Sequence, residues 1–177
     1  LLPYAEAVDG RPEIGDDVDA FLFHDDQNRL TATQRKPLLT AGELGRLAVA
    51  DFHPRFGWFL EIGIGRQLLL PLKELPPGKE CWPQKGDELH VVMKHDKQGR
   101  MLARLAKLDD FQAKVFRAPG SWRNELKTAW VTDVFRDGVF VLVEGGVLGF
   151  GALGYIPNGS ASRKLRIGEK VEARVTH

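Results

Sequence analysis

The sequence has almost no cysteine and no long apolar run. Cys81 is the single cysteine among 177 residues, so no disulfide can form within the chain, and this favours a reducing compartment. No stretch approaches the roughly 20 apolar residues that span a bilayer. We therefore expect a cytoplasmic protein with no membrane partner.

Residue sets typical of catalytic and metal centres are also missing. With one cysteine and five scattered histidines, Cys81 has no partner that would make it a nucleophile. His24 and His95 each have one or two aspartates beside them, which fits a surface histidine better than a metal site. The glycine-rich run 145–154 is not followed by Gly-Lys-Ser/Thr, so it is no phosphate loop. We expect no enzyme, metal, cofactor or small-molecule substrate.

Charge of one sign is not in excess. The net charge is +1, which gives no global sign of nucleic-acid binding. The basic residues nevertheless form two groups along the sequence: Arg46, Arg55, Arg66, Lys73 and Lys79, and then Arg163, Lys164, Arg166 and Lys170. Charge alone fits a solvated face at least as well as a binding surface.

One sequence pattern is repeated after 71 residues. Residues 15–18 (Gly-Asp-Asp-Val) match 86–89 (Gly-Asp-Glu-Leu), and His-Asp-x-Gln-x-Arg at 24–29 recurs at 95–100. A period near 70 is too long for a solenoid unit and suits a whole small domain. The chain is therefore expected to be a tandem array of small domains.

The repeat also predicts how much of each copy is present. Leu-Leu-Pro opens the chain at 1–3 and recurs at 69–71, and a fainter third copy has Tyr-Ile-Pro at 155–157. Because the chain begins and ends inside a copy, we expect an interior piece of a longer protein. The expected modules are the C-terminal part of the first at 1–37, a complete second at 38–110, and a linker with an incomplete third at 111–177.

The middle module has the strand layout of an OB-fold barrel. Short runs rich in bulky residues predict strands at 45–51, 58–62, 67–70, 89–94 and 100–105. The longest connection lies between the third and fourth strands, as in that fold. The predicted fold class is all-β, with tandem five-stranded OB-fold barrels that are incomplete at both ends.

In the first module, strands are predicted at 18–23 and 30–33, with Val18, Ala20 and Leu22 as the apolar stripe of the first strand. Asn28, in the turn between these strands, stands where the second copy has Gly99. Both residue types tolerate positive φ, as a tight turn requires.

In the third module, strands are predicted at 128–135 and 139–143. The glycine-rich run 145–154, absent from the second copy, is interpreted as a flexible hairpin, with a place where residues are missing as the alternative. A mild helical pattern at 109–118 predicts a linker helix before this module.

The run Phe56-Gly57-Trp58-Phe59, followed later by Asp96 and Arg100, resembles the RNA-binding OB-fold module of ribosomal protein S-one. The resemblance implies a surface site with Phe56 and Phe59 as its two aromatics and with Asp96 and Arg100 at a hairpin. The histidine of that family has no counterpart here, because Pro71 stands in its place.

The other two copies match this site in part. Asp25 and Arg29 correspond to the hairpin pair in the first copy. In the third copy only Phe140 corresponds, because Asp137 stands at the other aromatic position and Pro157 at the histidine.

Over essentially all of the chain, the tandem modules are similar to the conserved virulence factor B family. The similarity rests on Leu-Leu-Pro on the third strand and on Arg-Leu-Thr-Ala-Thr, then Lys-Pro, at the end of the first module. It implies consecutive RNA-binding modules that regulate gene expression in bacteria. The winged-helix domain that follows them in that family is not in this chain.

Chemistry supports stacking of bases on the two phenylalanines, with nearby cations neutralising phosphates. The cations expected to do so are Arg55, Arg66, Lys73 and Arg100. Strict alternation along a strand would bury either Phe56 or Phe59, so both reach the surface only if Gly57 makes a bulge. Asp96, placed before a tight turn, fits a purely structural pairing with its arginine as well.

Three functions stay open from the sequence. The first is non-catalytic binding of single-stranded RNA, centred on the second module. The second is a protein-interaction scaffold that has lost RNA binding, suggested by Pro71, Pro157 and the near-zero net charge. The third is binding of single-stranded DNA, which lacks the 2′-OH of RNA.

Overall fold

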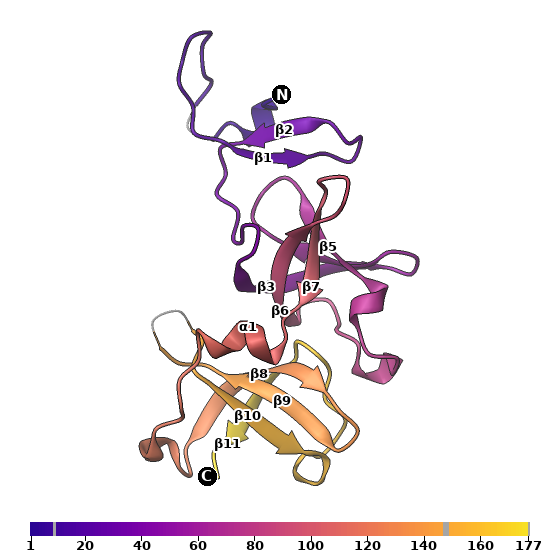
Figure 1. Cartoon of the computed structure of the whole chain (residues 1–177), viewed down its shortest axis with the longest axis vertical. Coiled ribbons are helices and arrows are strands. Elements are labelled where there is room, and N and C mark those ends of the chain that lie inside the picture. The colour runs from indigo at the N-terminus through magenta and orange to yellow at the C-terminus, as the bar shows by residue number, and fades with distance from the viewer. Residues whose placement is uncertain (9, 147–148, 177) are drawn as a thin grey trace.

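The computed structural model describes residues 1–8, 10–146 and 149–176. Three β units follow one another along the long axis: the N-terminal hairpin at one end, a barrel in the middle and the C-terminal sheet at the other end (Figure 1). The predicted all-β fold class is confirmed. A short α-helix, α1 (Leu108–Gln112), follows the barrel and covers only part of the predicted linker helix.

The middle unit is a closed five-stranded barrel. Its strands are β3 (Leu44–His53), β4 (Gly57–Glu61), β5 (Gln67–Pro71), β6 (Glu88–His95) and β7 (Met101–Leu105). Around the barrel the order is β3-β4-β5-β7-β6, with β5 and β7 parallel and the other pairs antiparallel. This is the OB-fold topology that the strand spacing predicted.

The barrel interior is filled by alternate residues of these strands, because successive side chains of a strand point to opposite faces. On β4, Trp58 and Leu60 are buried while Glu61 is exposed. On β5, Leu68 and Leu70 are completely buried. The indole Nε1 of Trp58 donates to the carbonyl oxygen of Pro83 at 3.1 Å, so this core tryptophan has no unpaired donor.

The N-terminal unit is a hairpin of β1 (Phe21–His24) and β2 (Leu30–Thr33). The predicted stripe on the first strand is wrong, because Val18 lies outside β1 and Leu22 is 58% exposed. Phe23 points inward instead and joins the hydrophobic cluster of the barrel. Burying the larger aromatic ring removes more apolar surface from water than burying the aliphatic stripe would.

The two hairpin turns have the predicted backbone conformation. Asn28 has φ = 60° and Gly99, at the same place in the second copy, has φ = 78°. Substitution of one by the other across the repeat is therefore explained by the left-handed conformation that the turn requires.

The C-terminal unit is a sheet of four strands. These are β8 (Leu126–Val134), β9 (Gly138–Val143), β10 (Ala152–Pro157) and β11 (Lys170–Arg174). Their order, β10-β9-β8-β11, is that of β5-β4-β3-β6 in the barrel. The described residues of this unit thus reproduce four of the five barrel strands.

The glycine-rich run 145–154 is only in part the hairpin connection predicted above: residues 145, 146 and 149–151 lie between the antiparallel strands β9 and β10. Its last residues belong to β10, where Ala152 pairs with Val143 and Gly154 with Val141. A Cβ atom on Gly154 would lie 3.2 Å from Val141 Cγ2, so this glycine serves close packing within the sheet. Residues 147 and 148 of the run lie outside the described residues.

Two short motifs that recur in the sequence, the proline of Leu-Leu-Pro or Tyr-Ile-Pro and a Gly-acid pair, form the same local structure in each copy. Single-turn 3-10 helices connect the strands: η1 (Tyr4–Glu6), η2 (Leu72–Glu74), η3 (Lys79–Cys81), η4 (Gly120–Trp122) and η5 (Asn158–Ser160). The three that follow the repeated prolines begin after Pro3, Pro71 and Pro157, each with φ near −65°. In each Gly-acid pair, the carboxylate accepts the amide N–H three residues earlier; the acids are Asp16, Asp87 and Glu169.

The C-terminal unit packs against the barrel through several side chains, of which Ile167 lies deepest in the barrel cluster. Ile167 is 1% exposed and belongs to the hydrophobic cluster of the barrel. The backbone around it is hydrogen-bonded to the barrel as well: Ile167 N–H donates to Cys81 O at 3.0 Å, and Glu88 N–H donates to Gly168 O at 2.9 Å. The second and third units therefore share part of a core.

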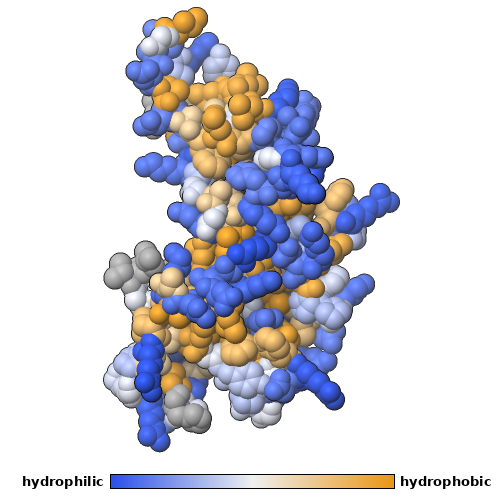
Figure 2. Space-filling view, viewed as in Figure 1, coloured by the Kyte–Doolittle hydropathy of each residue, from blue (hydrophilic) through white to orange (hydrophobic). Residues whose placement is uncertain are grey.

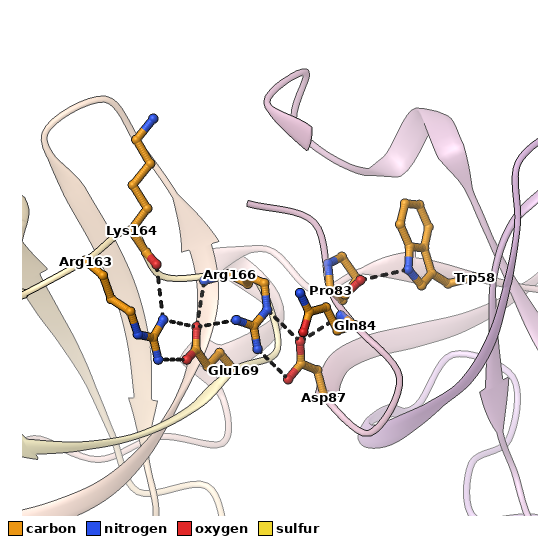
Figure 3. Close-up of polar contacts among 8 residues, drawn as sticks. All are labelled: Trp58, Pro83, Gln84, Asp87, Arg163, Lys164, Arg166 and Glu169. Atoms are coloured by element: carbon orange, nitrogen blue, oxygen red, sulfur yellow. Dashed lines mark hydrogen bonds and ion pairs between the residues drawn. The ribbon is translucent and has the colours of Figure 1, made fainter. Parts of the chain in front are cut away.

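Polar contacts surround Ile167 (Figure 3). The guanidinium of Arg166 bonds to Asp87 of the barrel at 3.2 Å and 3.3 Å. Arg163 and Arg166 both contact Glu169, which is nearly buried. The two arginines hold the pKa of the Glu169 carboxyl below its usual value although burial opposes this.

Exposed apolar surface is concentrated at the N-terminal end, where orange side chains cover much of the hairpin (Figure 2). Leu1 is 78% exposed, Leu22 58% and Leu30 55%.

Candidate nucleic-acid interface

Phe56 and Phe59 both reach the surface of the barrel. Phe59 is half-buried on the outer face of β4, and Phe56 is 56% exposed in the turn just before that strand. The alternation that would bury Phe56 is broken at Gly57, whose φ of +133° is rarely adopted by residues with a side chain. The register shift itself lies in β3, between Val49 and Asp51, and not at Gly57 as predicted.

Glycine is required at position 57 for a second reason. A Cβ atom there would lie 2.1 Å from the carbonyl oxygen of Leu70, which is far inside contact distance. Position 57 therefore accepts no residue other than glycine without rearrangement, and the backbone conformation at Gly57 lets the side chain of Phe56 point outward.

The two phenylalanines line a groove of about 740 Å³, here called the first groove. Arg66 and Arg100 line the same groove from the barrel, and Phe23 lines it from the N-terminal hairpin. The predicted aromatics and two of the predicted cations are thus brought together at the junction of two units.

His53 forms part of this surface, although sequence reasoning missed it. Its ring stacks on Phe56, with centroids 4.5 Å apart and planes at 26°. A histidine three residues before an exposed phenylalanine was visible in the sequence, but the tight turn that brings the rings together was not.

The Asp–Arg pair has the same geometry in both hairpins. Asp96 Oδ1 accepts the backbone N–H groups of Gln98 and Arg100, and its Oδ2 accepts Arg100 Nε at 2.8 Å. Asp25 and Arg29 repeat this arrangement, again with 2.8 Å between Nε and Oδ2. The aspartate closes the turn and fixes the direction of its arginine.

These bonds also determine the charge state of the aspartates. The backbone N–H and the guanidinium of Arg100 lower the pKa of Asp96. The guanidinium and then the backbone N–H of Arg29 lower the pKa of Asp25. Arg100 nevertheless stays half exposed, so part of its guanidinium faces solvent beside the first groove.

Arg66 has a different position from the other predicted cations. It donates to the carbonyl oxygen of His24 and lies 3.3 Å from Asp26 Oδ1, both in the N-terminal hairpin. Its side chain joins the two walls of the first groove. Arg55 and Lys73 are exposed on adjacent turns and make no ion pair with another described residue.

Phe140 is not near the first groove but occupies the equivalent place in the third unit. It lies opposite Asp133 on β8, as Phe59 lies opposite Asp51 on β3. Tyr155 and Phe135, which sequence reasoning missed, surround it with ring centroids 5.4 Å and 5.3 Å away.

This three-ring cluster was hidden because it depends on strand register. Tyr155 is on β10, directly opposite Phe140, and Phe135 lies just beyond the end of β8. Partial desolvation and a hydrogen bond with Asp137 raise the pKa of Tyr155. The aspartate at the expected aromatic position therefore contacts an aromatic ring from the next strand.

Two further observations concern other kinds of site. Among the described residues, no three His, Cys, Asp or Glu side chains gather closely enough to hold a metal ion. No helix within the described ranges is long and apolar enough to cross a membrane.

Comparison with known proteins identifies related chains. A family model described as the CvfB first S1-like domain matches residues 45–104, and an S1 domain model matches residues 1–35. The Bacillus subtilis protein named "Uncharacterized protein YitL" is 32% identical over 160 residues, which are 90% of this chain and 52% of that protein. Conserved virulence factor B of Staphylococcus aureus is 29% identical over 169 residues, 94% of this chain and 54% of that protein.

A solved structure from Streptococcus pneumoniae, described as a multidomain protein with nucleic acid binding domains, has a similar fold. It matches with a TM-score of 0.82 at 28% identity and covers 99% of this chain and 59% of that one. The chain spans about half the length of the curated relatives it matches. An S1 domain model and a model of the CvfB first S1-like domain thus match successive parts of this chain, which is similar to Conserved virulence factor B over most of its length.

Proposed function

We propose that this chain binds single-stranded RNA, without catalysis, in the first groove. The observation that carries the proposal is the convergence of Phe56 and Phe59 on one surface beside the half-exposed Arg100. Stacking of a base on an aromatic ring contributes about 1–3 kcal/mol and tolerates any base. Two rings and one cation at a groove fit a sequence-tolerant single strand.

Each predicted residue has a role in this proposal. Phe56 and Phe59 stack bases, and Arg55, Lys73 and Arg100 contact phosphates at the rim. The remaining predicted residues hold the site together: Asp96 orients Arg100, the pair Asp25 and Arg29 shapes the opposite hairpin, and Arg66 links the walls. Phe140 and its neighbouring rings extend the binding surface into the third unit.

The wider role is inferred from the family. Conserved virulence factor B proteins and a multidomain protein with nucleic acid binding domains are similar to this chain over most of its length. We infer that the chain is part of a cytoplasmic bacterial regulator of gene expression, with modules at 1–37, 38–110 and 111–177. Linked modules of modest affinity gain strength through effective concentration.

The test is fluorescence anisotropy with labelled single-stranded RNAs of graded length. The wild-type chain is compared with a Phe56→Ala, Phe59→Ala double variant and with Tyr4→Ala as the control. Tyr4 is 74% exposed and lines neither wall of the first groove. The double variant should lose about 2 kcal/mol or more of binding free energy, and the control should bind as the wild type does.

Other outcomes would favour the alternatives. Absence of RNA binding by the wild type at low salt would contradict the proposal and favour a protein-interaction scaffold. Equal affinity for the same sequence as RNA and as DNA would show that the 2′-OH is not recognised. Affinity that does not rise with RNA length would contradict the use of several modules.

A further inference from the structure

A second groove, of about 810 Å³, lies on the other side of the turn that carries Phe56. Phe52 at the end of β3 and Trp82 after η3 give it an aromatic wall, and Arg166 of the third unit closes it at the seam between the units (Figure 3). Phe52 is 43% exposed. This large apolar side chain at the end of a barrel strand has no role in the site already described.

The aromatic wall is held in a fixed arrangement. Phe52 lies 4.6 Å from Trp58 and 6.4 Å from Trp82, and the two tryptophans meet edge to face at 5.0 Å. Both indole N–H groups are used internally, on the carbonyl oxygens of Pro83 and Pro76. What the wall offers to a ligand is therefore ring surface and not a hydrogen-bond donor.

Charge around the second groove favours an anionic ligand. Of its two acids, Glu80 pairs with Lys164 at 3.1 Å, whereas Asp51 accepts the N–H of Phe52 at 2.8 Å and keeps its charge; the basic residues lining the groove are Lys79, Lys85 and Arg166. Lys79 and Lys85 are exposed and make no ion pair with another described residue, and Lys79 Nζ lies 5.6 Å from the Trp82 ring. Ring faces beside unpaired lysines suit a chain of bases and phosphates.

The two grooves are separated by a single tight turn. Phe56 lines the first groove, and Pro54, two residues earlier in the same turn, lines the second. The ring of His53, the residue between Phe52 and Pro54 in sequence, stacks on Phe56. A strand that leaves Phe56 across this turn next meets Phe52 and Trp82.

The far wall of the second groove is fixed in place before any ligand binds. Arg166 precedes Ile167, which is buried in the barrel core, and the Arg166 guanidinium is bonded to Asp87. A preformed groove avoids the entropic cost of ordering its walls when a ligand binds.

We propose that the second groove binds the continuation of the same single-stranded RNA, with bases on Phe52 and Trp82 and phosphates at Lys79 and Lys85. This inference rests on the proposed function and adds the path that the bound RNA takes across the barrel, from the first groove to the second. RNA long enough to pass the His53–Phe56 turn occupies both grooves, whereas a shorter RNA occupies the first groove alone.

The test uses the full chain and oligoribonucleotides from about 4 to 16 nucleotides, the range of OB-fold site sizes. Phe52→Ala should weaken binding of the longest RNA roughly tenfold and leave the shortest RNA that binds unaffected. Phe56→Ala should weaken both. Since Phe52 packs on Trp58, Lys85→Gln serves as a second variant at an exposed position that keeps the core intact.

Lys85→Gln should reduce the slope of log affinity against log salt by about one for the long RNA only. The matched control is Lys107→Gln, an exposed lysine that lines neither groove. Wild-type affinity for the long RNA in both folded variants would overturn the inference. If Phe56→Ala still weakens binding in that case, the proposed function stands; if the wild type binds no RNA, both fail.

Discussion

Replacement of Ile167 by alanine should destabilise the five-stranded barrel, although Ile167 lies in the C-terminal unit of the sequence. Ile167 is 1% exposed and packs in the cluster that contains the barrel core. Removing a buried isoleucine down to alanine costs about 2–5 kcal/mol of unfolding free energy, because transfer and cavity terms add. We expect a loss in that range for Ile167→Ala in urea unfolding followed by circular dichroism.

Amide hydrogen exchange can show which unit loses stability in Ile167→Ala. The Glu88 N–H on β6 donates to Gly168 O at 2.9 Å, so Ile167→Ala should raise its exchange rate together with those of its barrel neighbours. The control is Val171→Ala, because Val171 packs in the cluster of the C-terminal sheet. A loss below about 1 kcal/mol for Ile167→Ala, or exchange that rises only in the C-terminal sheet, would refute the shared core.

Three further predictions concern backbone and charge. Gly57→Ala should cost at least about 1–3 kcal/mol in urea unfolding, because the new Cβ meets Leu70 O at a strained φ; an unchanged midpoint would contradict this. The pKa of the Asp96 carboxyl should lie below 3.8 in a carbon NMR titration, since the backbone N–H and the guanidinium of Arg100 bind its charged form. The contribution of these bonds to folding stability is present at neutral pH and is lost as the pH falls through the lowered pKa. Burial lowers the pKa of His90 to about 3, so its imidazole should stay neutral at pH 5 by NMR, and stability should fall as the pH drops from about 6.5 toward 3.

Much of the fold was predictable because it is repeated. A motif that recurs at a fixed spacing identifies equivalent turns, and the positive φ of Asn28 and Gly99 follows from their shared position. The order of five short strands with one long connection was enough to predict the barrel topology. At these turns and strands, the local sequence preferences and the repeat predict the same structure.

The errors arose where tertiary contacts decide between local alternatives. The first strand has two faces of similar hydrophobicity, and only contact with the barrel selects Phe23 over Leu22. Gly154 belongs to a glycine-rich run that suggests a loop, but its lack of a side chain allows close packing in β10.

The candidate site was predictable in its centre and not at its edges. Phe56 and Phe59 stand in a recognisable run, so their position at one groove was expected. Phe52 and Trp82 are 30 residues apart in sequence, and the folding of the β5–β6 connection that brings Trp82 to the end of β3 is visible only in the structure. The same holds for Tyr155, which meets Phe140 across two strands.

The most direct test of the stacking account is RNA affinity measured as a function of salt for the wild type and the Phe56→Ala, Phe59→Ala double variant. Removal of uncharged rings should leave the number of phosphate contacts unchanged, so plots of log affinity against log salt should be parallel. The account predicts parallel lines displaced by about 2 kcal/mol or more. Coincident lines would show that the rings do not contact RNA, and a marked change of slope would show that the variant has lost phosphate contacts instead.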